Sequence, residues 1–229
     1  YLLRGRDKAE GAAAISTMVV DRVAGTLGLI WLGTLTNIWN YKLWEDSPIL
    51  GGQAFVFLGA SLASLILILT YLAPWKSRKS IESLTSESNP EHGFWKGLWI
   101  ALAAFRSSPW IFLGVLVLAM CVHFSIVGVY ALCAEMLEVD IPFKIHAYVV
   151  PALTMINGIP ISPAGLGFGE QGGKVLYHVI DKARGLTTHG HTEIPALFHS
   201  IVLLTSLLCA PAYFFMKGGA RKEDSDARN

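Results

Sequence analysis

The chain has 229 residues, of which 53% are hydrophobic and only 15% are charged. Soluble domains usually carry about 25% charged residues, and the mean hydropathy here is clearly positive at +0.48. The composition therefore excludes an ordinary soluble domain and indicates an integral membrane protein. The net charge of +1 gives no basis for nucleic-acid binding.

Four apolar stretches are long enough to cross a bilayer, which takes about 20 residues of helix. They cover residues 12–38, 51–73, 110–134 and 194–216. Three aromatic residues after the first stretch predict a membrane interface there: Trp39, Tyr41 and Trp44. The sequence opens at Tyr1 with neither Met nor a signal-peptide pattern, so we expect it to be the later part of a longer protein.

Two further segments flank or follow these spans. Residues 94–105 mix aromatic and aliphatic side chains, and Pro109 separates them from the third span. We expect an amphipathic helix lying in the interface, with the start of the third span as the alternative. Residues 217–229 are charged and predicted to be a disordered tail, which leaves residues 1–216 as the transmembrane domain.

A helix break interrupts the apolar region before the last span. Residues 159–170 contain two prolines, three glycines and Glu170. Proline removes a backbone donor and clashes with the preceding turn. The flanking halves, residues 146–159 and 170–180, are each shorter than a spanning helix. Broken backbone at membrane depth is tolerated only where protein covers it or water reaches it, and such breaks often mark a transport site.

The distribution of basic residues predicts the topology. Lys and Arg cluster in residues 1–8, 76–106 and 217–228, which the positive-inside rule assigns to the cytoplasm. After the first three spans, the chain is on the non-cytoplasmic side of the membrane. The last span must start on that side for the C-terminus to end in the cytoplasm. Residues 145–181 must therefore enter and return on one side, as a re-entrant hairpin or as two short full spans. The predicted fold is an all-α polytopic membrane protein with about four spans and this hairpin.

Polar residues follow the break at helical spacing. Those on one predicted face are Glu170, Lys174, Tyr177, His178 and Asp181. Glu170 precedes Lys174 by four residues, the favourable order for an ion pair. Ionisable groups near the membrane are functional candidates, so Glu170 and Lys174 are predicted to belong to a site. The other three, nearer the loop, are expected to be solvated.

The glycines suggest a helix terminus beside the break. If a helix starts near Gly167 or Gly169, its free amides favour an anion such as a lipid phosphate. Alternatively, Glu170 occupies that end itself, without a substrate. The Gly-x-Gly-x-Gly run is not a dinucleotide fingerprint, because no strand precedes it.

Arg22 is the second candidate. A charge deep in a span costs about 2.5–3.5 kcal/mol, so Arg22 either extends to the headgroups or meets an acid or a phosphate. His123 and His199 are expected to be hydrogen-bonded packing residues. The three cysteines lie in apolar runs and are expected to be small packing residues as well. No nucleophile–base pair or metal-ligand spacing is visible, so neither catalysis nor a cofactor is predicted.

Two motifs resemble a known family. The run Pro160-x-Ser162-Pro163-Ala164-Gly165-Leu166-Gly167-x-x-Glu170 resembles the signature of the lysylphosphatidylglycerol synthase transmembrane-region family. The early run from Ser16 to Gly25, which contains Asp21 and Arg22, resembles its acid-Arg element. The resemblance implies movement of a lipid-linked substrate between leaflets, and carries over Arg22 and residues 160–170. The lipid is aminoacylated phosphatidylglycerol in the named members and a polyprenyl- or hopanoid-type lipid in others.

The sequence thus predicts a flippase-like transporter of an anionic lipid or lipid-linked substrate in the cell membrane. Its predicted substrate-binding residues are Arg22, Pro160, Ser162, Gly165, Gly167, Glu170 and Lys174. Membrane lipids are the expected partners, with a homo-oligomer or a partner membrane enzyme also possible. The first alternative is a non-transporting subunit that anchors or regulates a lipid- or glycan-modifying enzyme. A second is a transferase acting on lipid-linked sugar, which would need a catalytic acid and metal ligands.

Overall fold

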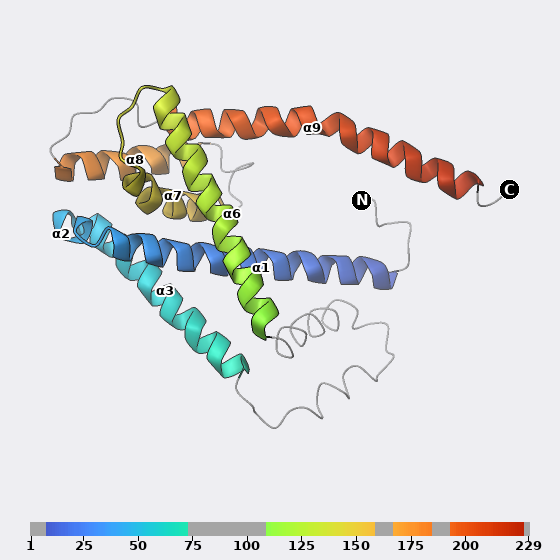
Figure 1. Ribbon diagram of the computed structural model, residues 1–229, viewed down its shortest axis with the longest axis horizontal. Coiled ribbons are helices and arrows are strands. Elements are labelled where there is room, and N and C mark those ends of the chain that lie inside the picture. The colour runs from blue at the N-terminus through green and yellow to red at the C-terminus, as the bar shows by residue number, and fades with distance from the viewer. Residues whose placement is uncertain (1–7, 73–108, 159–166, 185–192, 227–229) are drawn as a thin grey trace.

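The computed structural model describes residues 8–72, 109–158, 167–184 and 193–226 (Figure 1). Its helices are α1 (Lys8–Trp39), α2 (Leu43–Asp46), α3 (Pro48–Leu72), α6 (Pro109–Met136), α7 (Phe143–Asn157), α8 (Phe168–Arg184) and α9 (Glu193–Asp226). The described residues contain no strand, which confirms the predicted all-α fold.

Four of these helices are long and apolar enough to cross a membrane. The candidate spans are Met18–Trp39, Pro48–Thr70, Trp110–Met136 and Glu193–Pro211. They confirm the four predicted spans, with ends shifted by a few residues. Large apolar side chains along them are exposed, including Phe55, Leu67 and Leu118. Such faces suit contact with lipid tails, which are as apolar as leucine.

The predicted C-terminal tail differs from expectation, and the predicted interfacial helix cannot be compared. The tail is helical as far as Asp226 instead of disordered, because α9 continues through Lys217 without interruption. Extending an existing helix avoids the cost of nucleating a new one, and Lys, Arg, Glu and Ala favour it. The predicted interfacial helix, residues 94–105, lies outside the described residues. α6 begins at Pro109, the first-turn position that proline tolerates.

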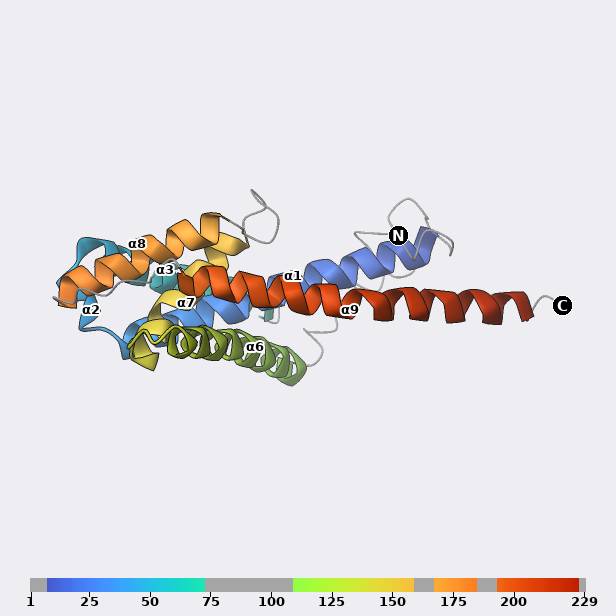
Figure 2. The ribbon, with the colours of Figure 1, turned by 90° about the horizontal axis from the view of Figure 1, so that it is seen from above.

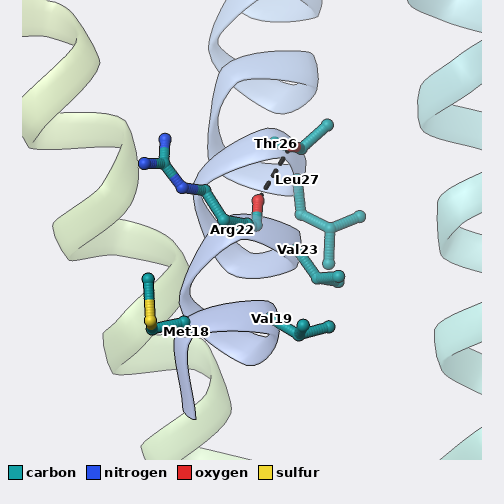
Figure 3. A pocket seen from close by; sticks show the side chains of 6 residues that line it. All are labelled: Met18, Val19, Arg22, Val23, Thr26 and Leu27. Carbon is teal, nitrogen blue, oxygen red and sulfur yellow. Dashed lines mark hydrogen bonds between the residues drawn. The ribbon is translucent and has the colours of Figure 1, made fainter. Parts of the chain in front are cut away.

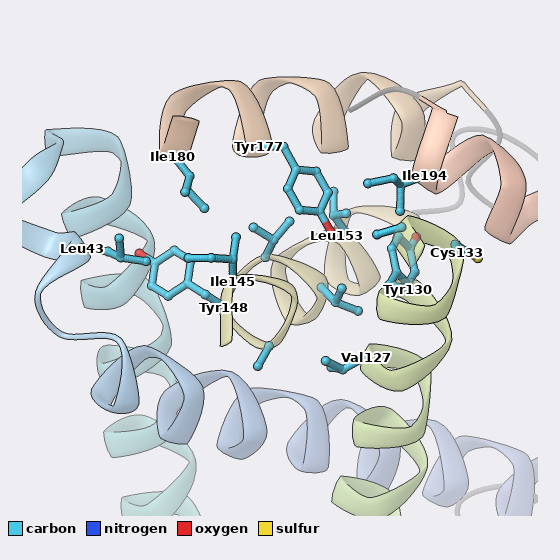
Figure 4. Close-up of a cluster of buried hydrophobic side chains, with 14 of the residues drawn as sticks. Leu43, Val127, Tyr130, Cys133, Ile145, Tyr148, Leu153, Tyr177, Ile180 and Ile194 are labelled. Carbon is cyan, nitrogen blue, oxygen red and sulfur yellow. The ribbon is translucent and has the colours of Figure 1, made fainter. Parts of the chain in front are cut away.

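α7 forms the centre of the packed core. It contacts α1, α6 and α8, and all residues from Ile145 to Pro151 are buried. Figure 4 shows the apolar side chains of this cluster filling the space between α7 and its neighbours. Tyr148 Oη donates a hydrogen bond of 2.7 Å to the Leu50 carbonyl, and Gln53 Nε2 donates one of 2.9 Å to the Tyr148 carbonyl. These bonds fix α7 to the first turn of α3.

Polar contacts also join the spans. The Thr34 hydroxyl lies 3.0 Å from the Phe57 carbonyl and is hydrogen-bonded to the Ser61 hydroxyl, which links α1 to α3. His123 of α6 is 3.0 Å from the Gly25 carbonyl of α1, confirming it as a hydrogen-bonded packing residue. Cross-helix hydrogen bonds of this kind are typical of membrane bundles.

The cysteines are all free thiols. Cys133 is buried, which confirms its predicted packing role. Cys121 and Cys209 are exposed instead, because they lie on outward faces of α6 and α9.

The crossing of α1 and α6 depends on a glycine. A Cβ at Gly28 would lie 2.6 Å from Ala119 Cβ and 3.1 Å from the Met120 amide nitrogen. We expect Gly28→Ala to lower the free energy of unfolding by about 1–3 kcal/mol through overpacking. Gly25→Ala is the matched control, since a Cβ there meets nothing within 4 Å. Thermal unfolding of the purified protein, followed by circular dichroism, measures both; equal stability of the two variants would contradict the close crossing.

Candidate functional site

α7 and α8 form an antiparallel hairpin. His146 near the start of α7 contacts Tyr177 of α8, whereas Asn157 at the end of α7 meets Gly169 at the start of α8. The helices contain 15 and 17 residues, or about 22 and 25 Å at 1.5 Å per residue. Both are shorter than the roughly 30 Å hydrocarbon core. The lengths favour a re-entrant hairpin over two full spans, whereas the antiparallel pairing fits both.

Glycines let α8 lie close to both α7 and α9. A Cβ at Gly172 would lie 3.2 Å from Ile156 Cδ1, and one at Gly173 would lie 2.5 Å from Pro195 Cγ. Figures 1 and 2 show α8 beside α7, with the start of α9 close to the start of α8. The hairpin is therefore held against the first turns of the last span.

Glu170 caps its own helix. Gly167 precedes α8 with a φ of +84°, a conformation that favours glycine. The Gly167 amide donates a hydrogen bond to Glu170 Oε2. Because Glu170 is the third residue of α8, this bond is the carboxylate half of a capping box. Of the two alternatives for this helix end, the structure therefore has the one in which Glu170 occupies it.

The second oxygen of Glu170 joins a cluster of four polar residues. Glu170 Oε1 accepts a hydrogen bond of 2.7 Å from His199 Nδ1, and the two side chains are only 16% and 4% exposed. Asn157 Nδ2 lies 3.5 Å from His199 Nε2. Tyr130 faces Asn157 and Glu170 from α6. We call these four residues the tip cluster; they come from α6, α7, α8 and α9.

The tip cluster contains two polar atoms that are not satisfied. Asn157 Oδ1 and Tyr130 Oη are buried and make no hydrogen bond of normal length in the part of the chain that the structure describes, although the two side chains face each other. Most buried polar atoms in proteins do have a partner. These two groups beside the partly buried carboxylate–imidazole pair therefore call for an explanation.

The burial of α8 differs from the prediction. Tyr177 and Asp181, expected to be solvated, are only 1% and 8% exposed. The face of α8 that carries Gly169, Gly173 and Tyr177 is turned toward α7, so residues one further turn along are covered too. His178 is exposed, as predicted.

The predicted ion pair between Glu170 and Lys174 is not formed. Glu170 turns back to the helix N-terminus and to His199, while Lys174 is exposed. Hydrogen bonds of Glu170 to the Gly167 amide and the His199 imidazole are more favourable than an exposed i,i+4 ion pair, which contributes only about 0.2–0.5 kcal/mol.

A second buried pair fixes the other end of the hairpin. His146 Nδ1 and Tyr177 Oη are 2.8 Å apart and both side chains are buried. We expect Tyr177→Phe to lower the free energy of unfolding by about 1–3 kcal/mol, because it leaves a buried imidazole nitrogen without this partner. Tyr41→Phe, at a residue that is 55% exposed, is the control. If Tyr177→Phe unfolds at the same temperature as the wild type, this hydrogen bond does not contribute to stability.

Arg22 lies on the exposed side of α1, four residues after the start of the candidate span at Met18. Together with five mostly apolar residues it lines an open hollow of about 620 Å³ (Figure 3): Met18, Val19, Val23, Thr26 and Leu27. Its backbone carbonyl accepts a hydrogen bond from Thr26 Oγ1 at 2.8 Å. Its guanidinium group has no acidic partner among the described residues.

The remaining predicted site residues have different outcomes. Pro160, Ser162 and Gly165 lie outside the described residues. His199 was expected to be a hydrogen-bonded packing residue, and it is buried and hydrogen-bonded. Its partnership with Glu170, 29 residues away, has no local signal in the sequence, and neither do the positions of Asn157 and Tyr130.

Four apolar spans and a hairpin of two shorter helices with buried polar groups define a polytopic α-helical membrane protein with an internal polar site. The sequence model of a family described as "Lysylphosphatidylglycerol synthase TM region" matches residues 1–187. The chain belongs to this family, as its motifs predicted. The match covers Arg22 and the hairpin, whereas His199 lies beyond it. No curated protein and no solved structure matches the chain.

Proposed function

We propose that the protein is a flippase-like transporter, not an enzyme, that moves an anionic lipid or lipid-linked substrate between the leaflets of the cell membrane. The family it belongs to is named for the transmembrane region of a lipid synthase, which is consistent with a lipid substrate. Membrane lipids are its partners in this proposal. Its C-terminus is cytoplasmic, because the basic segments of the sequence then lie inside.

The observation that carries the proposal is the environment of Arg22. Arg22 has no acidic partner among the described residues, and it is one of the residues that line an apolar hollow on a candidate span. Arginine binds phosphate in a bidentate manner, and the apolar wall suits acyl chains. Arg22 is about 6 Å from the start of the span at 1.5 Å per residue, a depth at which a headgroup phosphate can reach it.

The hairpin supplies the second part of the proposed route. It holds a partly buried carboxylate at the end of the molecule opposite the N-terminal end of α1 (Figure 1), and Lys174 offers an exposed cation one turn along α8. In this mechanism Arg22 receives the headgroup from the cytoplasmic leaflet. The hairpin then admits the headgroup, while the acyl chains remain in lipid.

Leaflet-resolved translocation in proteoliposomes tests the proposal. The full-length protein is reconstituted with fluorescent phosphatidylglycerol, aminoacylated phosphatidylglycerol or a polyprenyl phosphate, and a membrane-impermeant quencher reports the leaflet. We expect one of these probes to be moved. Arg22→Gln should reduce the rate roughly 10- to 100-fold, since a hydrogen bond to a charged group contributes about 1.5–3 kcal/mol.

Two further variants separate charge from geometry. Arg22→Lys keeps the charge but loses the bidentate contact, so an intermediate rate is expected. Lys42→Gln, at an exposed residue after α1, removes a cation elsewhere and should leave the rate unchanged. If the folded protein moves none of the probes, the alternative of a subunit that anchors or regulates a membrane enzyme is favoured. The next measurement would then be a pull-down with this protein, to detect a second copy of the chain or a partner enzyme.

A further inference from the structure

The tip cluster has the features of a proton-binding site. Its centre is the pair formed by Glu170 and His199, which lies between four helices and is mostly shielded from solvent. We propose that this pair binds one exchangeable proton and that proton uptake and release is coupled to movement of the hairpin. This inference rests on the proposed lipid transport and adds a coupling ion to it.

The pair has two well-defined protonation states. When His199 is neutral, Nδ1–H donates to Glu170 Oε1 and Nε2 carries a free lone pair, so the pair has a net charge of −1. A proton from the aqueous phase binds Nε2 and gives an imidazolium beside a carboxylate, with no net charge. The hydrogen bond at Nδ1 is kept in both states, so uptake requires no rearrangement of Glu170.

Asn157 is placed to serve both states. In the present orientation its Nδ2 faces His199 Nε2 at 3.5 Å, which suits a bare ring nitrogen. The Tyr130 side chain also faces the Asn157 amide. Turning the amide over would direct Oδ1 at a protonated Nε2. Asn157 can therefore donate to the ring in one state and accept from it in the other.

A proton fits the cluster better than a metal ion does. Each carboxylate oxygen of Glu170 already accepts a hydrogen bond from nitrogen, one from Gly167 and one from His199. Alkali and alkaline-earth cations take several oxygen ligands. No group of three or more His, Cys, Asp or Glu side chains that could hold a metal occurs in the described ranges.

Among the described residues, no cationic side chain other than His199 pairs with Glu170. The titratable groups that face it or lie next in contact are Tyr130 and Cys133 of α6, Tyr177 of α8 and His146 of α7. Phenols and thiols are uncharged near pH 7. The nearest charged residues on α8 and α9, Lys174 and Glu193, are exposed.

The charge change gives a physical reason for coupling. A partly buried site of net charge −1 is less favourable away from water than one that carries no net charge. The proton-free state therefore favours an arrangement in which the tip is hydrated, and the proton-bound state favours the closed packing of α8 on α9. Chains of acidic and histidine side chains serve as proton relays in other membrane transporters.

Nitrogen NMR of the full-length protein tests the site without any assumption about lipids. The protein carries ¹⁵N-labelled histidine in lipid nanodiscs, and His199→Gln assigns the resonance. We expect the ring-nitrogen shifts of His199 to change with pH. Glu170→Gln should alter this pH dependence, because it removes the carboxylate that accepts the hydrogen bond from Nδ1. The exposed His178 is the internal control, and the substitution should leave its resonances unchanged.

A second variant guards against misfolding of the first. Asn157→Leu removes the proposed acceptor but leaves Glu170 in place, so the pH dependence of the His199 resonances should change to a smaller extent. His199 resonances that do not change with pH, or a pH dependence that is the same in the wild type and both variants, would overturn the proposal.

Transport of fluorescent phosphatidylglycerol under an imposed pH gradient tests the coupling. We expect the gradient to change the rate at least threefold in the wild type and to have no effect in His199→Gln. If neither the pH gradient nor His199→Gln changes the rate of lipid transport, the coupling is wrong, but the proposed flippase function is not contradicted. Titration of His199 in a protein that moves none of the lipid probes would overturn the flippase function, and with it the coupling.

Discussion

Glu170→Gln is expected to reduce lipid translocation to the level of protein-free vesicles while the protein remains folded. Glutamine keeps the shape of the side chain but presents an NH₂ group toward either the Gly167 amide or His199 Nδ1, both of which are donors. Hydrogen bonds to a charged group contribute about 1.5–3 kcal/mol. At about 2–4 °C per kcal/mol for a chain of this size, the midpoint of thermal unfolding should fall by roughly 3–12 °C.

The matched control is Glu193→Gln. Glu193 is also an acid in the first turn of a helix, but it is exposed. Removing it should change neither the rate of translocation nor the unfolding midpoint by more than a small amount. Full transport by a folded Glu170→Gln protein would mean that this carboxylate only caps α8.

Gly169→Ala has the second-largest expected effect, because it acts on packing and on the tip cluster together. A Cβ at Gly169 would lie 2.3 Å from Asn157 Oδ1 and 2.8 Å from His199 Cε1. Neither neighbour can keep its present place, so α8 must move away from α7 and α9. We expect a loss of about 1–3 kcal/mol in unfolding free energy from overpacking, together with loss of most of the translocation.

Gly59→Ala provides the comparison in a position without neighbours. A Cβ at Gly59 meets nothing within 4 Å, and alanine favours helix over glycine by about 1 kcal/mol. This variant should therefore be as stable as the wild type or slightly more stable, with unchanged transport. Circular dichroism and the vesicle assay give the two readouts, and wild-type behaviour of Gly169→Ala in both would contradict the observed closeness of the hairpin to α9.

The sequence by itself determined the class of the protein and its helical elements. The four spans are visible as apolar stretches because lipid-facing helices need hydrophobic side chains over their whole length. The hairpin is visible because proline and glycine interrupt such a stretch, and Arg22 because a charge there is rare. Local features of this kind depend only on neighbouring residues, so they can be recognised in the sequence without knowledge of the tertiary structure. The motif resemblance also identified the family.

The tertiary structure decided which side chains meet. The sequence suggested that Glu170 pairs with Lys174, its neighbour one turn along the helix. In the fold, α8 turns the Gly169 and Gly173 face toward α7 and α9, which brings His199 within 2.7 Å of Glu170 and leaves Lys174 exposed. The same rotation buries Tyr177, which sequence analysis assigned to solvent. Helical periodicity defines the faces of a helix, but contacts with other helices decide which face is buried, and those contacts join residues far apart in the chain.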